Sequence, residues 1–434
     1  MAIGTQQTSQ TYTASDDGQN YRGPLAMVTT LFFMWGFLTS LNDILIPHLK
    51  SIFDLNYFEA MLVQFFFFLA YAVFSVPAGI LIERIGYKAS MVAGLLVMGV
   101  GAILFVPAAM VPSFPLFLVA LTILATGITI LQVSANPYVA VLGPASTASS
   151  RLTLTQAFNS LGTVIGPRLG ATVILGGAVA LTAEQLKSMS PEAVLAYRLH
   201  EASTVKMPYL AIAIALVLLA IVIGRFKLPH IPSAEGGHAA EKGAHDSIWH
   251  HRNLVMGALA IFTYVGAEVA IGSFMINYLH EPEIGNLPQA VAGIYLAYGY
   301  WGGAMVGRFL GSWVLRKISP RAVLAFNALV NAILVVVSMT TPGPVAMWTI
   351  ILVGFFNSIM FPTIFTLGIE GLGPLTGEAS GLLNTAIVGG AVIPPVQGLI
   401  ADRAGIHHAL ILPVFCYLYI VLFALKGTPR TTTA

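Results

Sequence analysis

Residues 115–142, PLFLVALTILATGITILQVSANPYVAVL, form a long run without a single charged side chain. A transmembrane helix needs about 20 mostly apolar residues, so this run is long enough to cross a bilayer. Its second half carries Gln132 and Asn136, which share one helix face because they are four residues apart, and then Pro137. The run therefore predicts a membrane-spanning helix with a polar patch in its second half.

Similar apolar runs recur along the chain and predict an all-α polytopic membrane protein with twelve spans. They cover 24–49, 57–82, 89–110, 115–142, 152–178, 207–224, 253–279, 288–314, 321–340, 345–369, 376–400 and 407–425. The 434 residues are 57% hydrophobic and 9% charged, whereas soluble domains carry about 25% charged residues. A soluble enzyme is thereby excluded. The net charge of +2 and the single Cys416 argue against a nucleic-acid partner and a disulfide-stapled fold.

The order of polar and apolar segments predicts two six-helix bundles. We expect a disordered cytoplasmic tail at 1–22, bundles at 23–227 and 252–426, a cytoplasmic linker at 228–251 and a second tail at 427–434. Loop lysines and arginines concentrate on the side of both termini, which the positive-inside rule places in the cytoplasm. The polar stretch 180–206 on the other side predicts short surface helices, with an N-cap at Ser190.

An internal repeat supports this division. Shifting the chain by 225 residues places several residues of one half on similar residues of the other: Asp43 on Glu268, Gln132 on Asn357, Pro137 on Pro362 and Asn159 on Asn384. Such parallel halves are typical of carriers that hold a cavity between two bundles. We expect no enzymatic chemistry and no cofactor.

Asp43 and Glu268 are carboxyl groups that lie well inside predicted spans, away from the span ends. Ionisable residues inside a membrane are costly and commonly mark ion or proton pathways. A carboxyl whose access to water alternates between the two sides can carry a proton, so both residues are candidates for proton coupling, with H⁺ as the coupling ion. The alternative is that either carboxyl is held by hydrogen bonds between helices.

Amides within the spans are candidates for binding a neutral, polyhydroxylated ligand, because they both donate and accept hydrogen bonds. The predicted substrate-binding residues are Asn42, Gln132, Asn136, Gln156, Asn159, Asn277, Asn357 and Asn384. The basic residues expected to gate the cytoplasmic side are Arg84, Arg308 and Arg316, together with Lys88 and Lys317. Arg168, after Pro167, has no predicted role.

Four motifs resemble the fucose permease branch of the major facilitator superfamily. They are LNDILIPHLK at 41–50, ILQVSANPYVAVLGP at 130–144, SRLTLTQAFNSLG at 150–162 and FPTIFTLGIEGLGP at 361–374. The resemblance is strongest to its bacterial glucose/galactose and N-acetylglucosamine permeases. It implies twelve helices in two bundles, alternating access and proton:sugar symport, with Asp43 as a required aspartate and Asn159 in the sugar site.

The chain departs from the fucose permease pattern at two positions. That pattern has a glutamate where this chain has Gln132, and a glutamine in the seventh-span VGAQ segment where this chain has Glu268. We hypothesise that the second membrane acid has moved from the fourth span to the seventh, with a shift of substrate away from L-fucose.

The sequence therefore predicts a monomeric inner-membrane symporter for a D-glucose- or D-galactose-type hexose, with the sugar and bilayer lipid as partners. The alternatives are L-fucose or N-acetylglucosamine as substrate and sodium-coupled or facilitated transport. From other classes, drug efflux and a sugar receptor that does not translocate remain open.

Overall fold

The computed structural model describes residues 21–53, 57–111, 113–170, 189–229, 231 and 247–426. All regular elements within these residues are helices, which agrees with the all-α prediction. Their outer surface is apolar: Leu218, Leu310 and Phe415 are each more than half exposed. Amides such as Asn357 are fully buried instead. This distribution suits a protein whose solvent is lipid.

The first half of the chain contains six described α-helices. They are α1 (Arg22–Phe53), α2 (Tyr57–Met110), α3 (Phe114–Val141), α4 (Ala148–Gly170), α6 (Pro191–Ser203) and α7 (Lys206–Arg225). Helix α2 covers two predicted spans, which are separated at Gly86, where φ is 77° and ψ is 169°. Residues with a Cβ rarely adopt this backbone conformation, so a glycine permits the chain to turn back here.

The second half is divided into shorter pieces. They are α8 (Arg252–His280), α9 (Gln289–Ile294), the π-helical η4 (Tyr295–Trp301), α10 (Gly302–Val314), α11 (Pro320–Thr340), α12 (Gly343–Asn357), α13 (Met360–Gly368), α14 (Thr376–Thr385), α15 (Gly389–Ala404), α16 (Ile406–Ala409) and α17 (Ile411–Lys426). Short 3₁₀ turns are found at Ala145–Thr147, Ile248–His250, Gly373–Leu375 and Ala386–Val388. Because π-helical turns are frequent at functional sites, η4 is a region of interest.

Nine segments of the described chain are long and apolar enough to cross a membrane, against twelve predicted spans. The segment Phe65–Met110 combines two predicted spans across Gly86. The predicted span 152–178 continues beyond α4 into residues outside the described part of the structure, and the predicted span 288–314 is divided into α9, η4 and α10. These three regions account for the difference.

The surface helix expected near 190 is α6, which begins after Ser190. The hydroxyl of Ser190 accepts a hydrogen bond from the backbone N–H of Ala193 at 3.3 Å, as an N-cap does. The prediction of this cap is confirmed.

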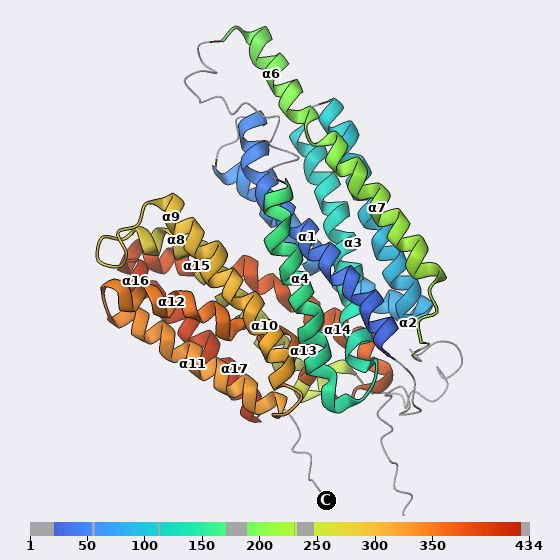
Figure 1. The fold of residues 1–434 in the computed structure, drawn as a ribbon, viewed down its shortest axis with the longest axis vertical. Coiled ribbons are helices and arrows are strands. Elements are labelled where there is room, and N and C mark those ends of the chain that lie inside the picture. Colours follow the sequence, from blue (N-terminus) through green and yellow to red (C-terminus); the bar gives the residue numbers. More distant parts are fainter. Residues whose placement is uncertain are drawn as a thin grey trace, which may run out of the picture.

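The two halves form neighbouring bundles that approach each other at one end (Figure 1). In the picture, the first-half helices in blue and green meet the second-half helices in yellow to red toward the lower end, where the chain leaves α17. Hydrogen bonds join the bundles there, among them Ser149 to Thr366 between hydroxyls at 2.6 Å and the Ser150 hydroxyl to the Ser312 carbonyl at 2.5 Å. We refer to this region as the joined end.

Candidate functional site

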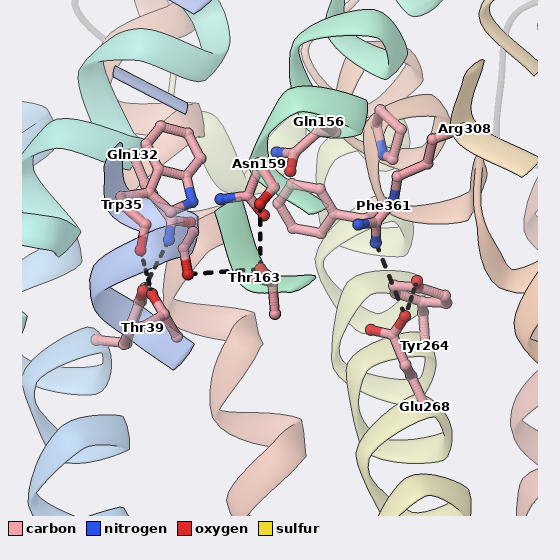
Figure 2. Close-up of a pocket in the computed structure, with 13 residues that line it drawn as sticks. Trp35, Thr39, Gln132, Gln156, Asn159, Thr163, Tyr264, Glu268, Arg308 and Phe361 are labelled. Atoms are coloured by element: carbon pink, nitrogen blue, oxygen red, sulfur yellow. Dashed lines mark hydrogen bonds and ion pairs between the residues drawn. The ribbon is translucent and has the colours of Figure 1, made fainter. Parts of the chain in front are cut away.

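A cavity of about 170 Å³ lies between the two bundles (Figure 2). Its lining residues come from both halves: Trp35, Gly36, Thr39, Tyr71, Gln132, Gln156, Asn159, Thr163, Tyr264, Glu268, Arg308, Phe361 and Pro362. Pockets for drug-sized ligands measure roughly 300–1,000 Å³, so this one suits a smaller molecule. Amides and hydroxyls line the first-bundle side, whereas the charged residues lie on the second-bundle side.

The first-bundle wall presents amides whose positions are fixed by hydrogen bonds. The Gln132 amide donates to the Tyr71 hydroxyl at 2.7 Å. The Asn159 amide donates to the Phe32 carbonyl at 2.9 Å, and the Gln156 amide lies 3.5 Å from its acceptor, Asn136 Oδ1. Because each NH2 group uses one of its two N–H donors in these bonds, the wall offers amide oxygens, hydroxyls and further N–H groups to a ligand.

Helices α1 and α4 approach closely enough at this wall to require a glycine. A Cβ built on Gly36 would lie 2.1 Å from the Asn159 carbonyl oxygen and 2.7 Å from its amide nitrogen. Neither distance is compatible with a side chain, so Gly36 is what allows Asn159 to lie against α1.

The second-bundle wall carries an ion pair. Arg308 Nη2 lies 3.9 Å from Glu268 Oε1, and both side chains are about one-eighth exposed. The Tyr264 hydroxyl donates to the same Glu268 oxygen at 2.7 Å. Arg308 also donates through Nε to the Ser358 carbonyl at 3.2 Å and through Nη1 to the Ser160 hydroxyl. Since Ser160 belongs to α4, Arg308 connects the two bundles at the cavity.

A buried polar cluster supports this wall from behind. Its centre is Asn357, whose amide N–H donates to the Tyr300 hydroxyl at 2.9 Å. Its Oδ1 accepts from the Tyr417 hydroxyl at 2.9 Å and from the Asn331 amide at 2.8 Å. The Tyr300 hydroxyl in turn lies 3.2 Å from the Glu268 backbone carbonyl. Asn357 thus orders residues around the carboxyl without facing the cavity itself.

Two aromatic rings complete the lining. Trp35 is 3% exposed and packs on Phe32, with 4.1 Å between ring centroids. Phe361 lies near Arg308 in the view of Figure 2. Aromatic faces next to hydrogen-bonding groups suit a ligand with both apolar and hydroxyl-bearing surfaces.

The structure brings some of the predicted site residues together and not others. Those that line the cavity are Gln132, Gln156, Asn159 and Glu268. Asn136 and Asn384 are fully buried and do not line the cavity, and Asn277 is exposed on α8. The side chains of Asn42, Asp43 and Arg168 lie outside the described part of the structure.

The basic residues expected at the cytoplasmic gate also lie in different surroundings. Arg84 is exposed, and Arg316 reaches across the bundles so that its Nε donates to the Ser150 hydroxyl at 3.3 Å. Arg308, expected with them, lines the cavity and pairs with Glu268, and its role in gating stays a prediction. The carboxylate and the Ser160 hydroxyl draw its long side chain inward from α10.

Several contributing residues were not singled out from the sequence. Tyr264 could have been found, because it precedes Glu268 by four residues and so shares its helix face. The hydroxyl of Thr39 donates to the Trp35 carbonyl at 2.7 Å. Ser160 and Asn331 carried no signal beyond being polar within an apolar span. Among the described residues no group of three His, Cys, Asp or Glu side chains could hold a metal ion.

Comparisons with known proteins agree with this architecture. A family model described as "Major Facilitator Superfamily" matches residues 28–395. The glucose/galactose transporter of Brucella abortus is 48% identical over 99% of this chain and 100% of its own length. The L-fucose-proton symporter of Escherichia coli is 37% identical over 96% of both chains. Among solved structures, the transporter FucP in the outward conformation superposes with a TM-score of 0.88 at 36% identity, covering 95% of this chain and 100% of that one.

Proposed function

The chain belongs to the Major Facilitator Superfamily, and from this premise we propose that it imports a hexose of the D-glucose or D-galactose type together with a proton. It is a sugar transporter of the same family as the fucose:proton symporters and not an enzyme. The relatives named as glucose/galactose transporters support the substrate, and the fucose:proton symporters support H⁺ as the coupling ion.

The chemistry of the cavity favours a small neutral ligand rich in hydroxyls. Gln132, Gln156 and Asn159 provide amide oxygens on one side, while Trp35 provides an aromatic face. Glu268 and Arg308, the one acid and one base that line the cavity among the described residues, are paired with each other. A charged ligand would have to break this pair, whereas a sugar can bind with the pair intact.

Coupling is assigned to Glu268, and the observation that carries this assignment is its position in the same cavity as the amides. When Glu268 takes up a proton, the charge that binds Arg308 is lost, and the wall can rearrange around the sugar. When the proton leaves on the other side, the ion pair reforms. Asp43 remains a second candidate from the sequence, as a proton site within the first span.

The bundles meet at the joined end, near the start of α1 and the end of α17 (Figure 1), so we infer that the cavity is closed there and opens toward the other side. With both termini in the cytoplasm of an inner-membrane protein, as the positive-inside rule indicates, this is an outward-facing carrier. Separation of the bundles at the joined end would then release sugar and proton into the cell. We propose that a single chain in the bilayer suffices, because each half supplies one wall.

Uptake into liposomes tests this function. We would measure labelled D-glucose, D-galactose, N-acetylglucosamine, D-mannose and L-fucose under an inward proton gradient, an inward sodium gradient and neither. Accumulation of D-glucose or D-galactose under the proton gradient alone, abolished by an uncoupler, is expected. Accumulation driven by sodium, or equilibration without accumulation, would replace the proton symporter with a sodium-coupled or facilitative carrier. Preference for L-fucose or N-acetylglucosamine would correct the substrate, and binding without uptake would indicate a receptor.

A further inference from the structure

Four buried polar atoms on helices of both bundles have no hydrogen-bond partners in the part of the chain described. They are Asn136 Nδ2, Thr153 Oγ1, Thr363 Oγ1 and Asn384 Oδ1, and each of the four side chains is fully buried. Nearly all buried polar groups in folded proteins are paired, so an unpaired group calls for an explanation. Four of them, from α3, α4, α13 and α14, form a pattern at one place in the molecule.

Their positions in the sequence connect them with the cavity. Asn136 follows the cavity residue Gln132 by one helical turn, and Thr153 precedes Gln156 by almost one turn. Thr363 directly follows Pro362, which also lines the cavity. Asn136 and Thr153 therefore extend the polar wall along α3 and α4 beyond the part that is open in this structure.

Their neighbours connect them with the contact between the bundles. Thr153 lies one turn after Ser149, and Thr363 lies just before Thr366. The hydroxyls of Ser149 and Thr366 bond to each other across the bundles at 2.6 Å.

The two asparagines lie beside another bond of this kind. Asn136 lies three residues after Val133, and Asn384 four residues after Ser380, while the Ser380 hydroxyl donates to the Val133 carbonyl at 2.7 Å. All four unpaired groups thus lie next to contacts that must separate when the joined end opens.

From this arrangement we infer that Asn136, Thr153, Thr363 and Asn384 form a second sugar-binding station, closed in this conformation and exposed when the bundles separate. The inference rests on the proposed function. Amide and hydroxyl groups can both accept hydrogen bonds from and donate them to a neutral hexose. Leaving them unpaired makes the closed joined end less stable than an apolar contact would be. This difference in stability favours opening of the joined end. The station then receives the sugar as it leaves the cavity.

Isosteric substitutions of the two threonines test the station. In Thr153→Val and Thr363→Val the shape is kept and only the hydroxyl is lost. We would measure the half-saturation for D-galactose in right-side-out and in inside-out membrane vesicles, together with the melting temperature of the purified protein. We expect the half-saturation for D-galactose to be unchanged from outside and to rise about fivefold from inside. A change of this size corresponds to the loss of one neutral hydrogen bond. The melting temperature should stay the same or increase, because no bond is lost in this conformation.

Two controls make the outcome specific. Thr129→Val on α3 also removes a buried hydroxyl, but one that donates to the Ala125 carbonyl at 2.9 Å. It should lower the melting temperature and leave both half-saturation values unchanged. Thr363→Ser keeps the hydroxyl, so its half-saturation from inside should be lower than that of Thr363→Val.

An unchanged value from inside in both valine variants overturns the station. A melting temperature lowered as in Thr129→Val does so too, because it shows that the hydroxyls are bonded in this conformation. A wild-type protein that carries none of the sugars overturns the proposed function and the station with it. Normal wild-type transport with unaffected variants overturns the station alone.

Discussion

Gln132 and Asn357, which the internal repeat places in equivalent positions, each donate an amide N–H to a tyrosine hydroxyl. The acceptor is Tyr71 at 2.7 Å in the first half and Tyr300 at 2.9 Å in the second. Gln132 lines the cavity, whereas Asn357 is fully buried behind Glu268. The same pair of groups thus presents an oxygen to a ligand in one bundle and supports a carboxyl in the other.

Replacing Asn357 with leucine should destabilise the protein more than it affects the ligand site directly. Tyr417 and Asn331 would lose their acceptor and Tyr300 its donor, and each buried group left unpaired costs about 1–3 kcal/mol. We therefore expect a loss of roughly 3 kcal/mol or more, measured as a lower melting temperature. Asn277→Ala, at an exposed position of α8, is the control and should have little effect. Normal stability with weaker sugar binding would instead make Asn357 a ligand contact.

Replacing Tyr71 with phenylalanine should weaken sugar binding. The hydroxyl that holds the Gln132 amide is removed while the ring remains, so the amide is free to rotate away from its ligand-binding orientation. A loss of about fivefold in affinity, close to one neutral hydrogen bond, is expected in equilibrium binding. Tyr298→Phe removes a hydroxyl from a half-exposed side chain and serves as the matched control. Equal affinities in the two variants would show that the Tyr71 bond does not position the amide.

Replacing Glu268 with glutamine should separate binding from coupling. The amide keeps the size of the side chain and can still meet the Tyr264 hydroxyl, but it can neither carry a proton nor pair with Arg308. We expect sugar exchange to continue while accumulation under a proton gradient disappears and uptake becomes independent of pH. Glu370→Gln, at an exposed carboxyl that pairs with Arg321 at 3.6 Å, should accumulate sugar normally. Intact accumulation in Glu268→Gln would move the coupling role to another group, with Asp43→Asn as the next variant.

The ion pair between Glu268 and Arg308 predicts that substitutions of these two residues have strongly non-additive effects on the free energy of unfolding. Arg308→Met leaves a carboxylate buried without its charge partner, and breaking such a pair typically costs about 3–5 kcal/mol. Adding Glu268→Gln to Arg308→Met removes the uncompensated charge, so the double variant should be more stable than Arg308→Met alone. A double-mutant cycle on the free energy of unfolding measures this difference. Additive losses would mean that the 3.9 Å contact contributes no coupling energy.

A methyl group at Gly36 should disturb the amide wall. In Gly36→Ala the new Cβ would meet the Asn159 carbonyl oxygen at 2.1 Å, so α1 and α4 must separate. Overpacking of this kind costs typically about 1–3 kcal/mol, and we expect both a lower melting temperature and weaker sugar binding. Gly293→Ala is the control, because a Cβ there would meet nothing within 4 Å. Unaffected binding in Gly36→Ala would show that Asn159 does not depend on this close approach.

The sequence by itself determined the all-α membrane architecture, because burying a backbone in lipid leaves helices as the solution for apolar runs of this length. It also identified Gln132, Gln156, Asn159 and Glu268 as polar points within spans, since such residues are costly in a membrane and are seldom placed there without a role. The repeat indicated which of them occupy equivalent positions. The spacing of residues along one helix and the free-energy cost of polar groups in lipid are sufficient for these predictions.

Only the tertiary structure decided what each of these residues contacts. Asn357 and Asn159 carry the same functional group. The packing of the helices buries Asn357 among three hydrogen-bond partners, whereas Asn159 lines the cavity. The structure also placed Arg308 beside Glu268, a neighbour that the sequence did not indicate. The side chains that meet at the cavity come from helices far apart in the chain. Their meeting depends on how the two bundles pack, which no spacing along the sequence specifies.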